Sequence, residues 1–183
     1  MDRNRDLAQG LSRIENQVAK PKYKTIRVIP TIAAVEVEDG EVLFAPTEIP
    51  KACLPNGVSI LKQIKVFDLA DIKVDIDLIF TETAPTVEAL TGAVAAKFNI
   101  VGGNSSDAIV QAANPLGAVI LDVNGSNTTA FDYSDNAVYI QNSVDMFVTS
   151  TTGSVHVMGV ATATKNYAAA TNLIFDFIFE EAR

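Results

Sequence analysis

Two stretches of this 183-residue chain alternate apolar and polar residues with a period of two, and this alternation limits the fold more than any other feature. In the first stretch the apolar members are Ile72, Val74, Ile76, Leu78 and Phe80, and the residues between them include Lys73, Asp75 and Asp77. In the second, Leu173, Phe175, Phe177 and Phe179 are expected to face inward, and Asp176 and Glu180 outward. Because successive side chains of a strand point to opposite faces, both stretches predict half-buried antiparallel strands.

Turn sequences divide the rest of the chain into short segments. Weaker alternation occurs at residues 26–28, 35–37, 60–67 and 155–162. Asp39-Gly40 separates two apolar runs, at 35–37 and 42–44, and predicts a β-hairpin. After residue 24, helices are expected only at residues 85–98 and 107–113. The sequence thus predicts roughly eight to ten strands in a mainly β fold, an antiparallel β-sandwich or barrel of jelly-roll type with short helical insertions.

The N-terminal segment differs in charge from everything after it. Residues 1–27 hold seven basic and three acidic residues, a net charge of +4, whereas residues 28–183 have a net charge of −12. An apolar stripe at helical spacing also runs through the segment. We therefore divide the chain into a basic arm, residues 1–23, helical or extended, and a β body, residues 24–183. The candidate partner-binding residues of the arm are Arg3, Arg5, Leu7, Leu11, Arg13, Ile14, Val18 and Lys20.

Charge is sparse in the second half of the body. Between Phe98 and Phe179 there are only seven charged residues, and short polar and small residues take their place. Such a composition is consistent with polar loops, but it also suits burial between subunits, where charges are costly to desolvate. We favour a homo-oligomer.

No pattern typical of a catalytic or metal site stands out, so we expect no enzyme activity and no cofactor. Cys53 is the only cysteine and is expected to be a packed thiol, and His156, the only histidine, a strand residue facing solvent or a subunit interface. Asp75 with Asp77, and the acidic turn at residues 36–41, lack the spacing of a calcium loop and are expected to be solvated. The net charge of −8 disfavours nucleic acid binding. The apolar runs are too short to span a membrane.

The strands and turns from residue 24 to residue 183 follow a definite order. Its elements are Lys24–Val28, Glu41–Phe44, Thr47–Pro50, Asn56-Gly57, Ile60–Asp68, Ile76–Phe80, a helical insertion and Leu173–Phe179. This layout resembles the capsid cement or decoration proteins of tailed bacteriophages. The resemblance implies a protein without catalytic activity, made in the host cytoplasm, that binds the major capsid protein on the virion surface as an oligomer, often a trimer.

Residues 1–23 depart from the shorter forms of that group. We expect this arm to dock on an acidic surface of the capsid or of another copy, through its basic and apolar residues. The alternative is a head-fibre or adhesion domain that binds host-surface glycans through loops 124–129 and 149–154. A hydrolase that uses acidic residues is a third possibility.

Overall fold

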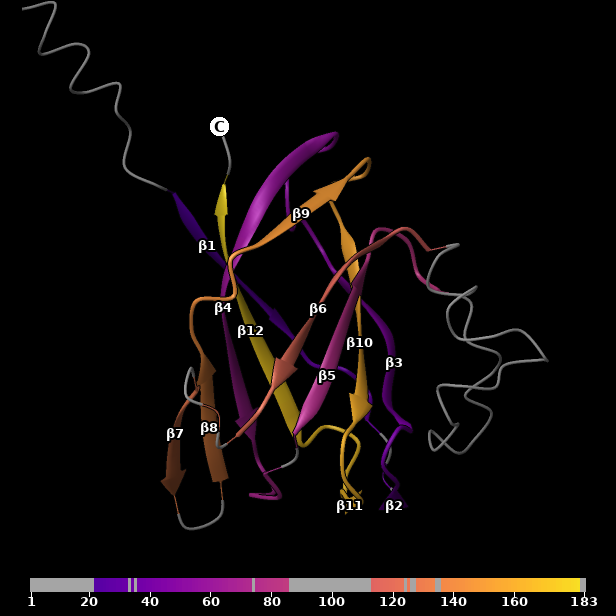
Figure 1. Ribbon diagram of the computed structural model, residues 1–183, viewed down its shortest axis with the longest axis vertical. Coiled ribbons are helices and arrows are strands. Elements are labelled where there is room, and N and C mark those ends of the chain that lie inside the picture. The colour runs from indigo at the N-terminus through magenta and orange to yellow at the C-terminus, as the bar shows by residue number, and fades with distance from the viewer. Residues whose placement is uncertain are drawn as a thin grey trace, which may run out of the picture.

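The computed structural model describes residues 22–32, 34, 36–73, 75–85, 113–123, 125, 128–133 and 136–181. These residues form two antiparallel sheets packed face to face, together with a small two-stranded sheet at one end of the body (Figure 1). The fold is therefore mainly β and a sandwich, as predicted.

The larger sheet has six strands in the order β1-β12-β4-β8-β7, and β9 also pairs with β4. Its long central strand β4 pairs with β9 through its first half and with β8 through its second half. The strands are β1 (Tyr23–Val28), β4 (Gly57–Asp68), β7 (Thr128–Tyr133), β8 (Asn136–Gln141), β9 (Met146–Ser150) and β12 (Leu173–Glu181).

The second sheet has four strands in the order β3-β10-β5-β6. These are β3 (Val42–Ile49), β5 (Ile76–Thr81), β6 (Pro115–Leu121) and β10 (Val155–Ala161). The two-stranded sheet joins β2 (Glu36–Val37) to β11 (Lys165–Asn166).

Phenylalanine rings from both sheets hold the sandwich together. The ring of Phe175 lies 5.4 Å from that of Phe44 in β3, and the ring of Phe177 lies 5.8 Å from that of Phe80 in β5, edge to face. All four side chains are fully buried, and Phe175 and Phe177 stack on one another. Aromatic pairs in such geometries stabilise a core beyond their buried area, so β12 is the strand that ties the sheets together.

The predicted C-terminal strand is confirmed, with all its inward residues fully buried. Asp176 lies on the opposite face, as predicted, but its side chain is only 11% exposed because Arg27 covers it. Glu180 is half-buried.

The strand predicted from residue 72 begins only at Ile76. Residues 71 and 73 have positive φ angles of 52° and 56°. The carboxylate of Asp68 accepts the backbone amides of Ile72 and Lys73, so this segment wraps around a buried anion instead of extending. Hydrogen bonds from these backbone amides to the Asp68 side chain therefore override the alternation ahead of β5.

The predicted hairpin around Asp39-Gly40 is wrong. The turn exists, with the amide of Glu41 donating to the carbonyl of Glu38 at 3.1 Å. However, β2 pairs with β11, and β3 pairs with β10. The amide of Gly40 donates to the carbonyl of Ala161 at the end of β10, and this bond directs the chain into the four-stranded sheet.

No helix occurs among the described residues. The helices predicted at 85–98 and 107–113 lie almost wholly outside them, as does the arm up to residue 21. Within the part of the chain that the structure describes, no helix is long and apolar enough to cross a membrane.

Candidate partner-binding surface

The candidate surface is the outer face of the six-stranded sheet, which points away from the four-stranded sheet. Directly opposite residues of an antiparallel pair lie on the same face, so the strand register gives the rows of side chains that cross it. One apolar row consists of Phe131, Val138, Phe67 and Ile174. Phe131 is 46% exposed, and the other three are half-buried. Apolar side chains thus cross four strands while still in contact with solvent.

The neighbouring row carries charge and consists of Thr129, Ile140, Lys65, Asp176 and Arg27. Two guanidinium nitrogens of Arg27 donate to the two carboxylate oxygens of Asp176 at 2.7 and 2.8 Å. The guanidinium carbon lies 5.2 Å from the centre of the Phe67 ring. The hydrogen bond to Asp176 raises the pKa of Arg27. Because this pair is already formed, its charges need no new counter-charge when the face is covered.

A third row lies where the chain enters the body and consists of Phe147, Ile60, Glu180 and Tyr23. Phe147 is 66% exposed and Tyr23 is 55% exposed. The amino group of Lys62 forms an ion pair with Asp145 and lies 3.8 Å from Glu180. Exposed aromatic rings beside mutually compensated charges are typical of protein interfaces.

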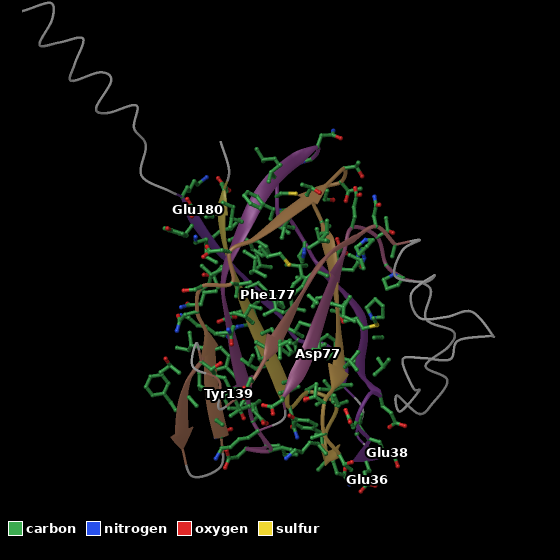
Figure 2. The ribbon with its side chains drawn as sticks, viewed as in Figure 1. Glu36, Glu38, Asp77, Tyr139, Phe177 and Glu180 are labelled. Atoms are coloured by element: carbon green, nitrogen blue, oxygen red, sulfur yellow. The ribbon has the colours of Figure 1, made fainter. Side chains whose placement is uncertain are left out.

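Acidic residues gather at the opposite end of the sandwich, around the β2–β3 turn, the β4–β5 loop and the ends of β5 and β6. They are Glu36, Glu38, Asp39, Asp71, Asp75, Asp77 and Asp122. Figure 2 shows Glu36 and Glu38 at this end and Glu180 at the other. Burial raises the pKa of Asp77, and the charge of Asp39 raises it further. The chain therefore enters the body, at residue 22, at the end remote from its acidic end.

Asp68 is the most completely bonded carboxylate of the acidic end, and it is fully buried. Its Oδ1 accepts the amide of Ala70 at 3.0 Å. Its Oδ2 accepts the amides of Ile72 and Lys73 and the hydroxyls of Tyr139 and Tyr167, at 2.9 to 3.4 Å. Burial, followed by the charge of Asp68, raises the pKa of Tyr167. These bonds shape the β4–β5 loop and give Asp68 a structural role.

The titratable residues singled out in the sequence do not converge. Cys53 is buried, as predicted, and burial raises the pKa of its thiol. His156 lies on β10 and is half-buried, with Nδ1 3.4 Å from the carbonyl of Glu82. Asp75 precedes β5 and accepts the amide of Val123 at 2.8 Å. Within the described residues, no three His, Cys, Asp or Glu side chains could together hold a metal ion.

A cavity of about 10 Å³ lies between the sheets. Such a volume holds at most one water molecule. Its lining includes Val66, Ile76, Leu121 and Tyr139.

The loop at residues 149–154, proposed for glycan binding, uses its polar groups internally. The hydroxyl of Ser150 donates to the carbonyl of Ser154 at 2.6 Å and accepts the amides of Thr152 and Gly153. A carboxylate oxygen of Glu82 accepts the amide of Thr151 at 2.8 Å, and this bond lowers the pKa of Glu82. These bonds stabilise the turn and occupy groups that a sugar would need.

The sequence-predicted arm residues and three residues of the other proposed loop, 124, 126 and 127, lie outside the described residues. Sequence reasoning missed the outer face because its rows join residues far apart in the chain, such as Phe67 and Ile174. A local signal of this face exists at Phe131 and Phe147, because each is a large apolar residue at an outward position of a short strand.

No family model matches the chain, and no curated protein matches it. Among solved structures, the VP2 subviral particle of infectious bursal disease virus is 14% identical, with a TM-score of 0.20, over 90% of this chain and 38% of that chain. A structure of the Gx strain of infectious bursal disease virus has the same identity and coverage, with a TM-score of 0.16. This chain therefore spans little more than a third of these chains. A likeness this weak carries no argument about the function of this chain.

Proposed function

We propose that this chain is a structural virion protein that binds and stabilises an icosahedral phage capsid as a homo-oligomer, as a cement or decoration protein does. The layout of strands and turns from residue 24 onward motivates the class of protein. The outer face of the six-stranded sheet supplies the binding surface. The trimer is implied by the resemblance alone, and the strand pairing argued below favours a dimer in its place.

One observation carries the proposal: the outer face exposes aromatic rings beside the ion pairs Arg27–Asp176 and Lys62–Asp145. Phe131 and Phe147 are 46% and 66% exposed, and the bidentate pair of Arg27 and Asp176 lies between their rows. Burying apolar area contributes roughly 25 cal/mol per Å². Covering this face on a capsid would thus gain hydrophobic energy while Arg27 and Asp176 keep each other as partners.

The proposed mechanism is linkage by mass action. A contact that forms only on the assembled shell stabilises the shell over its dissociated subunits. Repetition by symmetry multiplies this effect, since many copies bind one particle. In this proposal the basic arm adds a second point of attachment. Arg3, Arg5, Arg13 and Lys20 would contact acidic surface, and Leu7, Leu11, Ile14 and Val18 would supply apolar contacts.

We also propose that the protein has no catalytic role. This proposal is supported by the hydrogen bonds of two acidic side chains, which give them structural roles. Asp68 is surrounded by five hydrogen-bond donors, and Glu82 accepts the side-chain amide of Asn114 as well as the amide of Thr151. These carboxylates hold loops in place.

Co-sedimentation with capsids that lack the protein tests the binding face. Phe147→Lys places a charge in the proposed interface and should lower capsid occupancy at least tenfold. Ile120→Lys is the matched control, because Ile120 is also 66% exposed but lies on the four-stranded sheet. Occupancy unchanged by Phe147→Lys, or lowered equally by both substitutions, would contradict the proposal. Circular dichroism checks that both variants are folded.

A further inference from the structure

We propose that two copies of this chain pair through strand β7, antiparallel about Ala130, and so join their six-stranded sheets into one continuous sheet. The partner is a second copy, and the contact is a backbone ladder between edge strands. This pairing does not depend on the capsid assignment, because it is argued from the edge of β7, which has a single neighbour among the described strands.

Strand β7 ends the six-stranded sheet and has only β8 beside it among the described strands. An edge strand presents a row of unpaired backbone N–H and C=O groups, which favours pairing with another strand. Thr129, Ala130 and Phe131 are all exposed, so both faces of the strand are accessible at its centre. The free edge is outermost in the view of Figure 1, where β7 lies at the lower left.

The other strands at the ends of the two large sheets carry features that oppose pairing. β1 contains Lys24 and directly follows the exposed Lys22. β3 contains Pro46, and its pairing with β10 has two register shifts. β6 begins at Pro115, contains Gly117 and has a register shift against β5. Lysine, proline and bulges are the devices by which natural sheets protect their edges.

Strand β7 has none of these features. Its sequence is TTAFDY, without proline, glycine or a basic residue, and its six pairs with β8 run without a register shift. Threonine and aromatic residues also favour strands. β9 also has a single ladder, with β4, but it lies against β6 and β10 of the other sheet. Among the other described edge strands of the two large sheets, β7 is thus the one whose sequence leaves its edge able to pair.

The centre of the pairing follows from symmetry and charge. A two-fold axis perpendicular to the sheet keeps each residue on its face, so the axis must pass at a residue and not between two residues. With the axis at Ala130, Phe131 lies opposite Thr129 of the second copy. Cross-strand pairs of an aromatic and a β-branched residue stabilise a sheet. The two Asp132 positions are then four residues apart, about 14 Å along the strands. This separation exceeds the screening length of about 8–10 Å in physiological salt, so the two charges repel one another only weakly. An axis at Phe131 would halve the separation.

The pairing has a consequence for the outer face. Because the axis is perpendicular to the sheet, the outer faces of both copies point the same way, and the two Phe131 residues lie close to the axis. The apolar row of each copy thus meets the row of Thr129 and Ile140 in the other.

The first test measures the mass of the full chain by light scattering after size-exclusion chromatography. We expect twice the mass of the chain for the wild type and a single chain for Thr129→Lys. Thr25→Lys is the matched control, since Thr25 is exposed and central on the other edge strand of the same sheet. It should keep the wild-type mass. A wild-type monomer or trimer, or a dimer that survives Thr129→Lys, would overturn the inference.

The second test fixes the register by disulfide formation. Opposite residues of an antiparallel pair have Cα atoms about 4.5–5.5 Å apart, within the range of about 4.4–6.8 Å that a disulfide spans. Ala130→Cys should therefore cross-link two copies under mild oxidation. Thr128→Cys should not, because each Thr128 lies four positions from its counterpart. The native Cys53 is buried and should not interfere. Cross-linking at 128 but not at 130, or at neither, would overturn pairing about Ala130.

Discussion

Replacing Asp68 by alanine should lower the free energy of unfolding by about 4 kcal/mol. The carboxylate accepts three backbone amides and two tyrosine hydroxyls at 2.9 to 3.4 Å, and it is fully buried. Tyr167 is fully buried too, so its hydroxyl cannot turn to water, and an unsatisfied buried hydroxyl costs about 1–3 kcal/mol. The three amides lie in a half-buried loop where water can replace part of their bonding, so each should contribute only about 1 kcal/mol.

Urea denaturation followed by circular dichroism measures this loss directly. Asp68→Asn keeps an acceptor oxygen for the four donors at Oδ2 and loses the bond to the amide of Ala70, so it should cost about 1–2 kcal/mol. Glu36→Gln changes an exposed carboxylate of the same end and should stay within about 0.5 kcal/mol. A loss below about 1 kcal/mol for Asp68→Ala, or equal losses for Asp68→Asn and Glu36→Gln, would refute the reasoning.

Three further predictions concern single residues. Gly159→Ala should destabilise the protein by about 3 kcal/mol in the same urea assay, because its Cβ would lie 2.2 Å from a ring carbon of the buried Phe44; a loss below about 1 kcal/mol would contradict the packing. The pKa of Asp77 is raised, so its destabilising charge at neutral pH is relieved as the pH falls through that pKa. Asp77→Asn should therefore raise the melting temperature at pH 7 more than at pH 3.5, and the reverse order would be inconsistent with that direction. The pKa of Glu82 is lowered, so its stabilisation is present above the ordinary glutamate pKa and is lost as the pH falls through the lowered value. Glu82→Gln should lower the melting temperature at pH 7, and a melting curve unchanged there would contradict it.

Local pattern was sufficient to predict the strands that lie across the core. The alternation at 173–179 predicted β12 because every second residue there meets the opposite sheet. The alternation failed ahead of β5, where the carboxylate of Asp68, four and five residues earlier in the chain, accepts the backbone amides of Ile72 and Lys73. The turn at Asp39-Gly40 was predicted but not its partners, since a two-residue turn does not reveal which distant strand lies beside it.

The candidate surface could not be predicted from local sequence pattern, because it also depends on which distant strands are neighbours. The row of Phe131, Val138, Phe67 and Ile174 exists only once three strand registers are set, and two of these join segments separated by about seventy residues or more along the chain. Charge, by contrast, was visible in the sequence as a basic segment ahead of an acidic body. The structure adds where the acidic groups gather, at the end remote from residue 22.

The position of β12 between β1 and β4 sets the order in which the protein can form. During synthesis, β1 and β4 emerge long before residues 173–181. Until that strand is available, β1 lacks its ladder partner and β4 has only β8 and β9 beside it. Contacts between such distant segments make folding slow, and unsatisfied strands in the interval are prone to aggregate. A ribosome-bound chain that stops short of residue 173 should therefore be protease-sensitive, because the last strand supplies the neighbour that β1 and β4 share.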